Sequence, residues 1–352
     1  MTDAKDIRSF TYERLKEEII RIDEKAFRAD QIFDWLHKKG ADSFDEMTNL
    51  SEGLRKKLSE NYEIYSAKPV KVLTSSDGTR KYVMGLNDGN VIETVLLKYD
   101  FGNSICISSQ VGCRMGCKFC ASTVDGLVRG LFASEMLSQV YSVEKDCGER
   151  ISHVVVMGSG EPLDNMDSLT GFVDLITDSR GKNLSGRNIT VSTCGLVPQI
   201  RALADRNYAF TLALSLHAVN NEKRRKIMPI ANKYPLEEVI DACRYYFDVT
   251  GRRITLEYSL ISGVNDTDED VEGLSAIASR LDAHVNLIPV NPIKERQFVP
   301  TSRKDAILLK NKLEKKHINV TIRREMGRDI SASCGQLRRD FLKDHKQGEA
   351  NA

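Results

Sequence analysis

The pattern of hydrophobic and polar positions divides the chain into three parts. Near the N-terminus, apolar residues recur at helical spacing, most plainly in segments 12–20 and 29–37. Apolar runs then alternate with Ser-Asp-Gly at 76–78 and Asn-Asp-Gly at 87–89, which are typical of hairpin turns. From residue 103 onward, short apolar runs alternate with segments long enough to form helices. We therefore expect helices first, then an antiparallel hairpin region, then an alternating α/β region.

The alternating region contains apolar runs that we interpret as strands. They lie at 104–108, 153–157, 188–192, 210–215, 253–258, 284–289 and 319–322. The clearest helices between them are 236–245 and 304–310, and Ser134 is a candidate N-cap of another helix. Alternation at this repeat length predicts a parallel sheet with helical crossovers, either a partial barrel or an open sheet of roughly six units. In both architectures, ligands bind at the carboxyl ends of the strands.

The strand expected at 91–97 carries a charge in an apolar setting. Both of its faces are apolar apart from Glu93 and Thr94. A carboxylate on a strand that is buried on both sides is costly unless it is paired or has a chemical task. Glu93 is therefore interpreted either as a paired structural residue or as part of a site.

Composition narrows the class of protein. With 41% hydrophobic and 29% charged residues, the 352-residue chain is an ordinary globular protein of two or three domain-sized units. No apolar run approaches the length that crosses a bilayer, and the N-terminus lacks a signal-peptide core. We therefore expect a cytoplasmic protein without a membrane partner. Eight cysteines in such a protein favour metal binding or catalysis over structural disulfides.

The charge of the chain says little about its partners. A net charge of +1 gives no support for nucleic-acid binding, so any RNA contact must come from local basic patches. The candidate patches are 224–226, 252–253, 323–324 and 338–339. We interpret each of them as a solvent-exposed face.

Three cysteines lie within eight residues of one another. They are Cys113, Cys117 and Cys120. Thiolates are the usual ligands of iron–sulfur clusters, and three of them leave one iron of a four-iron cluster open to another molecule. Gly112 and Gly116 allow the backbone to wrap closely around such a group. The alternatives are a zinc site or a chance grouping, but zinc normally takes four ligands, and the next cysteine and histidine are distant, at Cys147 and His153.

Polar groups also follow four of the predicted strands. They are Gly160 and Glu161 after 153–157, Ser192 after 188–192, Ser215 to His217 after 210–215, and Asn291 after 284–289. Taken singly, each is as well explained by a turn or a structural contact as by a ligand. Because the carboxyl ends of parallel strands meet at one edge, we expect these groups to converge on one mouth.

The spacing of the three cysteines, with Phe119 directly before the last, resembles the radical S-adenosylmethionine (SAM) superfamily. The stretches 106–113 and 120–123 are similar to one branch of it, the RlmN/Cfr adenine-methylating enzymes. The similarity runs from about residue 90 to residue 338 and more loosely through the N-terminal part. It implies an α/β fold with a partial (β/α)6 barrel. The parts expected are a helical accessory domain at 1–68, a β-hairpin extension at 69–100 carrying Glu93, the barrel at 101–340 and a polar tail at 341–352.

The resemblance implies a role for each of these groups. It implies one 4Fe–4S cluster per chain, ligated by Cys113, Cys117 and Cys120. It implies contacts with SAM from Gly160, Glu161, Ser192, Ser215, Leu216, His217 and Asn291. Glu93 would accept a proton. Cys334 would take a methyl group from one SAM and, activated with a second SAM, join it to adenine; a transient disulfide between Cys106 and Cys334 would release the product.

The resemblance further implies a methyltransferase that makes 2-methyladenine in 23S ribosomal RNA, at the peptidyl transferase centre, and in transfer RNA anticodon loops. Its partners would be those RNAs and a one-electron reductant such as flavodoxin or ferredoxin, and the enzyme would act as a monomer. The alternatives are the Cfr type, which methylates carbon 8 of the same adenine, and a radical SAM enzyme with a non-RNA substrate. A third is an RNA-binding protein with a structural iron–sulfur or zinc site. The motif residues are shared between the carbon 2 and carbon 8 types, so they do not separate them.

Overall fold

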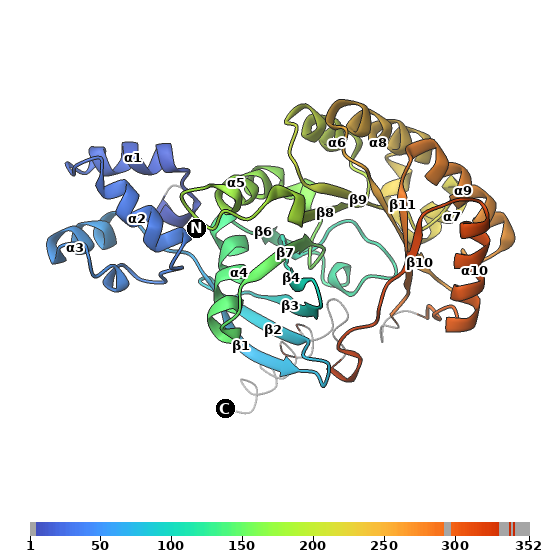
Figure 1. Ribbon diagram of the computed structural model, residues 1–352, viewed down its shortest axis with the longest axis horizontal. Coiled ribbons are helices and arrows are strands. Elements are labelled where there is room, and N and C mark those ends of the chain that lie inside the picture. Colours follow the sequence, from blue (N-terminus) through green and yellow to red (C-terminus); the bar gives the residue numbers. More distant parts are fainter. Residues whose placement is uncertain (1–4, 292–296, 331–337, 339–340, 342–352) are drawn as a thin grey trace.

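The computed structural model describes residues 5–291, 297–330, 338 and 341 (Figure 1). The N-terminal part is helical, as predicted, and forms a lobe beside the rest of the molecule. Its helices are α1 (Tyr12–Arg21), α2 (Arg28–His37) and α3 (Glu52–Asn61), with 3-10 turns at Ile7–Ser9 and Phe44–Glu46. The side-chain oxygens of Thr11 and Ser51 accept hydrogen bonds from the first turns of α1 and α3, and this capping defines where both helices begin.

Most strands of the described chain belong to one ten-stranded sheet. In spatial order they are β1 (Ala67–Thr74), β2 (Arg80–Leu86), β3 (Val91–Tyr99), β4 (Gly102–Cys106), β7 (Ile151–Val156), β8 (Ile189–Thr193), β9 (Thr211–Ser215), β10 (Thr255–Leu260), β11 (His284–Pro289) and β12 (Val320–Ile322). The first four pair antiparallel and the strands from β4 to β12 pair parallel. Two further strands, β5 (Gln110–Gly112) and β6 (Leu127–Gly130), form a small antiparallel sheet of their own.

The predicted hairpin region is β1 to β3. Gly78 and Gly89 have φ values of 84° and 81°, the left-handed conformation that hairpin turns require and glycine adopts without strain. The first four residues of β3 are all buried, so the expectation of a strand covered on both faces is confirmed. Glu93 therefore lies in an apolar strand inside the molecule.

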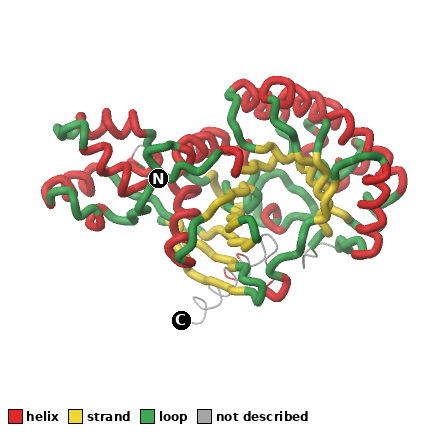
Figure 2. Tube along the Cα trace, in the orientation of Figure 1, coloured by secondary structure: helices red, strands yellow, loops and turns green. Residues whose placement is uncertain are grey.

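Helices connect the parallel strands and cover the outer face of the sheet (Figure 2). They are α4 (Ala133–Cys147), α5 (Met166–Thr177), α6 (Val197–Asp205), α8 (Leu236–Thr250), α9 (Asp268–Leu281) and α10 (Arg303–Lys315), with the short α7 (Asn221–Ile227) before α8. The sheet is curved, but β1 and β12 remain its two edges, so the barrel does not close. The predicted partial barrel of six β–α units is confirmed.

Two local predictions need correction. Ser134 is not the N-cap of α4, because the helix begins at Ala133 and the hydroxyl of Ser134 instead contacts the Asp6 carboxylate, far away in the sequence. Several strands are also displaced by about two residues. The run at 104–108 gives a strand at Gly102–Cys106, and the run at 253–258 gives one at Thr255–Leu260. Apolar periodicity locates an element better than it locates its ends.

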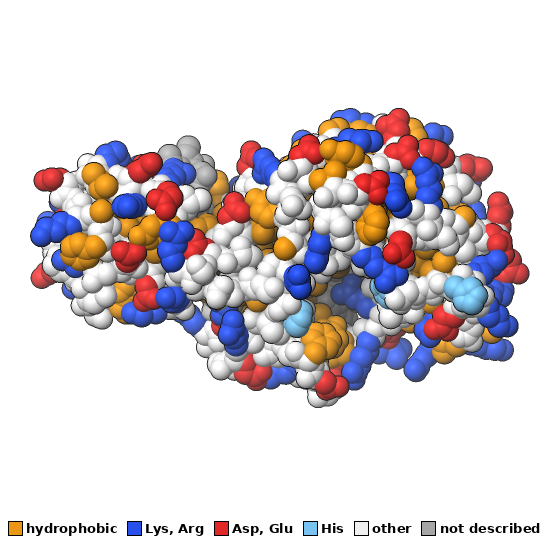
Figure 3. Space-filling view, turned by 45° about the horizontal axis from the view of Figure 1, so that its top comes forward, with side chains coloured by type: hydrophobic (Ala, Val, Ile, Leu, Met, Phe, Trp, Pro, Cys, Tyr) orange, Lys and Arg blue, Asp and Glu red, His pale blue; other side chains and the backbone are white. Residues whose placement is uncertain are grey.

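One buried apolar cluster extends from Ile7 in the N-terminal lobe to Val320 in the last strand, so the two lobes share a core. On the surface drawn in Figure 3, positive and negative side chains are interspersed, in keeping with the net charge of +1. Among the described helices, none has the length and apolar composition of a membrane-crossing segment.

Candidate active site

A cavity lies at the carboxyl ends of the parallel strands. Its lining includes Cys113, Cys117, Cys120, Gly160, Glu161, Ser192, Ser215, His217 and Asn291. The fold therefore brings together the three cysteines and the polar strand-end groups that the sequence analysis singled out. Leu216 is the exception. Its side chain is fully buried and does not line the cavity, although its backbone N–H donates to the Glu257 carbonyl (3.0 Å) beside it.

The cysteines lie on a loop that begins directly after β5 and returns to β6. The loop is fixed at its start by a hydrogen bond from the Cys113 N–H to the Gly126 carbonyl (2.9 Å). In its middle, the Lys118 N–H donates to the Ile227 carbonyl at the end of α7 (2.8 Å). Gly112 has a φ of 77°, and a Cβ there would lie 2.0 Å from the Gly126 carbonyl oxygen. Glycine at this position thus permits the close approach on which the loop depends.

The environment of the thiols fits an iron–sulfur cluster. Burial raises the pKa of Cys113 to about 12 and raises that of Cys117 well above its usual value, and the neighbouring thiols add to both shifts. Thiolates can therefore form together here only when a cation compensates them. No three His, Cys, Asp or Glu side chains of the described chain converge as ligands of a single metal ion would. In a four-iron cluster each thiolate binds a different iron, so its ligands surround the cluster and do not meet at one atom.

Gly160 and Glu161 follow β7. Gly160 has a φ of 112°, and a Cβ there would come within 2.7 Å of Gln110. The Glu161 carboxylate is buried and accepts hydrogen bonds from the backbone N–H groups of Cys194 (2.7 Å) and Leu163 (3.1 Å). Burial raises the pKa of Glu161, while these hydrogen bonds oppose the shift. The carboxylate thus joins the ends of β7 and β8 and lines the cavity at the same time.

His217 has a specific local geometry. It adopts a φ of 53°, its Nδ1 accepts a hydrogen bond from the Ser259 N–H (2.9 Å), and its ring meets that of Phe119 edge-on at 4.7 Å. Burial lowers the pKa of His217 to about 3, so the ring is neutral at pH 7. Because Phe119 belongs to the cysteine loop, this contact sets the distance between that loop and the end of β9.

Glu93 lies on the hairpin extension and is buried, with 5% of its surface exposed. One carboxylate oxygen is 3.3 Å from the Lys81 ammonium, and the other accepts a hydrogen bond from the Arg338 N–H (2.5 Å). Cys106 is buried at the end of the adjacent strand β4. Neither Glu93 nor Cys106 is among the described residues that line the cavity. Cys334 lies outside the described residues, and no disulfide joins two described cysteines, so the predicted pairing of Cys106 with Cys334 stays a prediction.

Comparison with known proteins identifies the family. Residues 5–64 match the Ribosomal RNA large subunit methyltransferase N-terminal domain, and residues 107–274 match the Radical SAM superfamily. A protein of Lachnospira eligens named "Probable dual-specificity RNA methyltransferase RlmN" is 57% identical over 96% of this chain and 97% of its own length. One of the same name from Clostridium perfringens strain SM101 is 55% identical over 96% of this chain and 98% of its own length. The chain belongs to the RlmN family.

A solved structure agrees with this assignment. A radical SAM methyltransferase from Sphaerobacter thermophilus has a TM-score of 0.90 and 39% identity, with 94% of this chain and 98% of that chain covered. The predicted SAM-dependent RNA methyltransferase class, the 4Fe–4S cluster and SAM are thereby confirmed for this RlmN-family chain. The individual roles of the site residues stay predictions.

The structure corrects the interpretation of two basic patches. Arg224 is fully buried and Arg338 is 8% exposed, although both belong to segments predicted to face solvent. Arg225, Lys226, Arg323 and Arg324 are exposed as predicted. A run of like charges does not reveal which member turns inward, because that depends on contacts with distant segments.

The cavity of this RlmN-family site also has lining residues that were not predicted from the sequence. Glu257 and Ser259 of β10 and Arg323 after β12 line the cavity. Glu257 is 5% exposed, accepts a hydrogen bond from the Asn286 amide (2.9 Å), and has a pKa raised by burial. The signal that singled out Glu93, a carboxylate within an apolar strand, was also present at Glu257.

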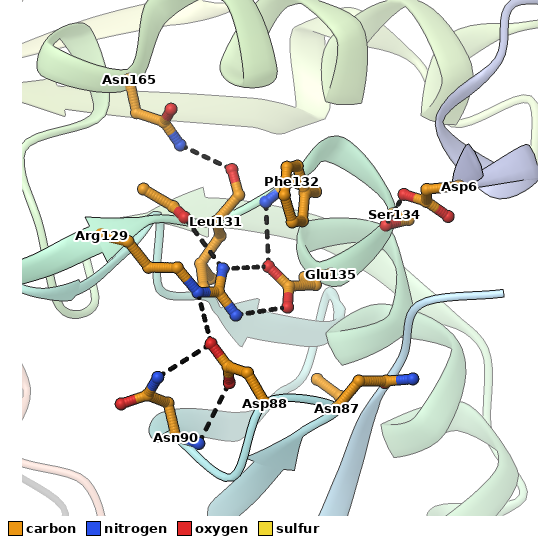
Figure 4. A network of polar contacts seen from close by, with 12 residues as sticks. Asp6, Asn87, Asp88, Asn90, Arg129, Leu131, Phe132, Ser134, Glu135 and Asn165 are labelled. Atoms are coloured by element: carbon orange, nitrogen blue, oxygen red, sulfur yellow. Dashed lines mark hydrogen bonds and ion pairs between the residues drawn. The ribbon is translucent and has the colours of Figure 1, made fainter. Parts of the chain in front are cut away.

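A polar network supports the cysteine loop from outside (Figure 4). Arg129 of β6 forms a bidentate ion pair with Glu135 of α4 (2.8 Å to each oxygen) and a further one with Asp88 (2.7 Å). Asp88 belongs to the turn between β2 and β3. Although burial acts to raise it, hydrogen bonds from Arg129 and Asn90 hold the pKa of Asp88 at about 2. The network thus joins the hairpin extension, the loop's return strand and the start of α4.

Proposed function

We propose that this chain methylates carbon 2 of adenine in 23S ribosomal RNA, at the peptidyl transferase centre, and in transfer RNA anticodon loops. The observation that carries the proposal is the cavity. It brings three thiols of the radical SAM spacing and the strand-end groups of β7, β8, β9 and β11 to one place. The names of the relatives, which describe dual-specificity RNA methyltransferases, supply the substrate class.

The cavity divides into two proposed binding regions. Cys113, Cys117 and Cys120 would hold the cluster. Gly160, Glu161, Ser192, Ser215, Leu216, His217 and Asn291 would hold SAM. When bound, the cluster supplies the electron that cleaves SAM. Gly160 has no side chain, so a ligand can approach the backbone closely at this position. His217 is buried and neutral, so it adds no charge beside that ligand.

Glu93 is the proposed proton acceptor, Cys334 the proposed methyl carrier, and Cys106 its proposed disulfide partner. Support comes from the described residues on either side of Cys334. On one side, the Asp329 carboxylate accepts a hydrogen bond from the Ser76 N–H (3.1 Å) of the hairpin extension. On the other side, the Arg338 N–H donates to Glu93 itself (2.5 Å). The chain is therefore held on the hairpin extension both before and after Cys334.

The wider organisation is part of the same proposal. We propose that 1–68 is an accessory domain for RNA, 69–100 the extension that carries Glu93, 101–340 the catalytic barrel and 341–352 a tail. The enzyme would act in the cytoplasm as a monomer and take electrons from a donor such as flavodoxin or ferredoxin.

The test is an anaerobic reaction of the reconstituted protein with unmodified ribosomal RNA, a one-electron reductant and methyl-labelled SAM. Mass spectrometry of the nucleosides is expected to find the label in 2-methyladenosine. Label in 8-methyladenosine would contradict the carbon 2 assignment while leaving the site intact. SAM cleavage without any labelled nucleoside would contradict ribosomal RNA as a substrate. Cys334→Ala is the matched control, since it should abolish methylation but keep reductive SAM cleavage.

A further inference from the structure

Arg224 occupies an unexpected position behind the cavity. It lies on α7, between the end of β9 and the segment that contacts the cysteine loop, and it is fully buried, whereas its neighbour Arg225 is exposed. Its guanidinium donates from Nη2 to the Cys194 carbonyl (2.7 Å) and from Nε to the Leu216 carbonyl (3.2 Å). Both carbonyls belong to the carboxyl ends of strands that border the cavity.

The positive charge of Arg224 is uncompensated in the described protein. No described carboxylate lies within ion-pair distance of it, and its Nη1 is buried without a hydrogen-bond partner. A guanidinium stays protonated even when buried, and a buried charge without a counter-charge is costly. Its helix is also joined to the cysteine loop beside Cys117, because the Lys118 N–H donates to the Ile227 carbonyl at the end of α7 (2.8 Å). Cys117 is one of the proposed cluster ligands.

An anionic cluster would supply the missing negative charge. A four-iron cluster held by three thiolates is negatively charged, and its negative charge increases when it accepts an electron. A fixed positive charge in a dry environment favours the reduced, more negative form, because charges interact strongly where water is excluded. The unpaired charge of Arg224, which lies behind the cavity wall, fits a neighbour of this kind.

We propose that Arg224 is the buried counter-charge of the 4Fe–4S cluster and raises its reduction potential, so that a cytoplasmic one-electron donor can reduce it. Arg224 is a positioning residue: it acts through the cluster and does not touch the substrate. The inference rests on the proposed ligation of the cluster by Cys113, Cys117 and Cys120. The alternative is a purely structural role, in which Arg224 only holds the ends of β8 and β9 together as a clamp. The experiment must distinguish this role from an effect on the cluster.

The experiment measures the midpoint potential of the reconstituted cluster by electron paramagnetic resonance at a series of set potentials, without SAM or RNA. Arg224→Gln removes the charge but keeps N–H donors for the strand-end carbonyls. We expect its potential to be more negative than that of the wild type by at least a tenfold change in the one-electron equilibrium, which is about 59 mV. Arg225→Gln is the matched control on the same helix, with the same charge change at an exposed position, and should keep the wild-type potential.

Arg224→Lys completes the set, because it keeps the charge but loses the planar arrangement of donors. We expect it to bind iron and sulfide as the wild type does and to keep most of the potential. If Arg224→Gln takes up no cluster while Arg224→Lys does, the charge acts on assembly of the cluster, and the proposed effect on its potential is overturned. An unchanged potential in Arg224→Gln, or loss of the cluster in both variants, would overturn the proposal in favour of the clamp.

A wrong assignment of the cluster ligands would give a different experimental result. If the triple variant with alanine at Cys113, Cys117 and Cys120 still bound the cluster, the ligand assignment itself would be wrong. A wild-type cluster that depends on those three thiols, combined with an unmoved potential in Arg224→Gln, would remove only the role of Arg224.

Discussion

At the scale of single residues, the main feature of the hairpin extension is a buried pair of opposite charges. Glu93 stood out in the sequence as a carboxylate in an apolar strand. Its partner did not, because Lys81 lies in a strand whose neighbouring residues Arg80 and Tyr82 give no sign of which side chain turns inward. The structure shows the Lys81 ammonium fully buried, 3.3 Å from the Glu93 carboxylate. The ammonium thus gives the Glu93 carboxyl group a partner where water cannot reach it.

Removal of the Lys81 ammonium should show how much the buried pair contributes to stability. Lys81→Met leaves Glu93 buried without its ammonium, so we expect the free energy of unfolding to fall by about 3–5 kcal/mol. Equilibrium denaturation in urea measures the change. Lys98→Met is the control, since Lys98 pairs with Glu149 on the surface (2.5 Å) and should cost about 1 kcal/mol or less. Equal costs for the two variants would show that the buried pair has no special weight.

At the scale of elements, the cysteine loop depends on how close two backbone segments come. A Cβ on Gly112 would lie 2.0 Å from the Gly126 carbonyl oxygen, a contact that no small adjustment relieves. We expect Gly112→Ala to separate β5 from β6 and to reduce the iron bound after reconstitution several-fold, measured as iron per folded chain. The residue also needs a positive φ, of 77°, and this strain must be separated from the clash.

Gly126→Ala provides that separation. Gly126 has a similar φ of 70°, but a Cβ there meets nothing within 4 Å. The alanine at position 126 therefore adds backbone strain without a clash, costing about 1–2 kcal/mol, and should leave iron binding close to that of the wild type. Equal loss of iron in both variants would mean that conformational strain, and not the approach of the two segments, limits the loop.

The elements themselves could be predicted because their signals are local. Apolar runs and turn sequences located every strand from β7 to β12, and the shared edge of a parallel sheet correctly brought Glu161, Ser192 and His217 to one cavity. The predictions that were wrong concern residues whose contacts come from segments far away in the sequence. The hydroxyl of Ser134 contacts Asp6, from the start of the chain, and does not cap its own helix. Arg224 is buried against the strand-end carbonyls of Leu216 and Cys194, and no pattern within its own segment predicts these contacts.

At the scale of the whole molecule, the helical lobe and the barrel are joined by a shared core, by surface ion pairs such as Lys145–Asp42 (2.8 Å) and by buried polar contacts. His37, the last residue of α2, lies 3.3 Å from the Tyr141 hydroxyl of α4 and packs against the Phe33 ring. Arg8 and Asp178 are the charged groups whose fields act on His37. Nearby, Asp6 joins the same lobe to Ser134 of α4. The junction therefore contains a buried imidazole and a buried carboxyl group with shifted pKa values.

These two groups give the stability of the junction opposite dependences on pH. Burial lowers the pKa of His37 to about 3, so between pH 6.5 and pH 3 the unfolded chain binds a proton that the folded chain does not. Stability from His37 is complete above pH 6.5 and is lost as the pH falls. Burial raises the pKa of Asp6 to about 6, so its contribution is complete below pH 3.8 and is lost as the pH rises through 6. The pH profile of the wild type alone cannot separate the two.

A comparison of variants can separate them. His37→Leu removes the buried base and keeps Asp6, so the difference in unfolding free energy between this variant and the wild type isolates His37. We expect this difference to move in favour of the variant by up to about 1.4 kcal/mol per pH unit as the pH falls from 6.5 towards 4. Tyr141→Phe removes the hydroxyl that faces His37 but keeps the imidazole, and it should retain the wild-type slope. Parallel profiles for His37→Leu and the wild type would mean that His37 takes up a proton as readily in the folded chain as in the unfolded chain, and would contradict a pKa lowered by burial.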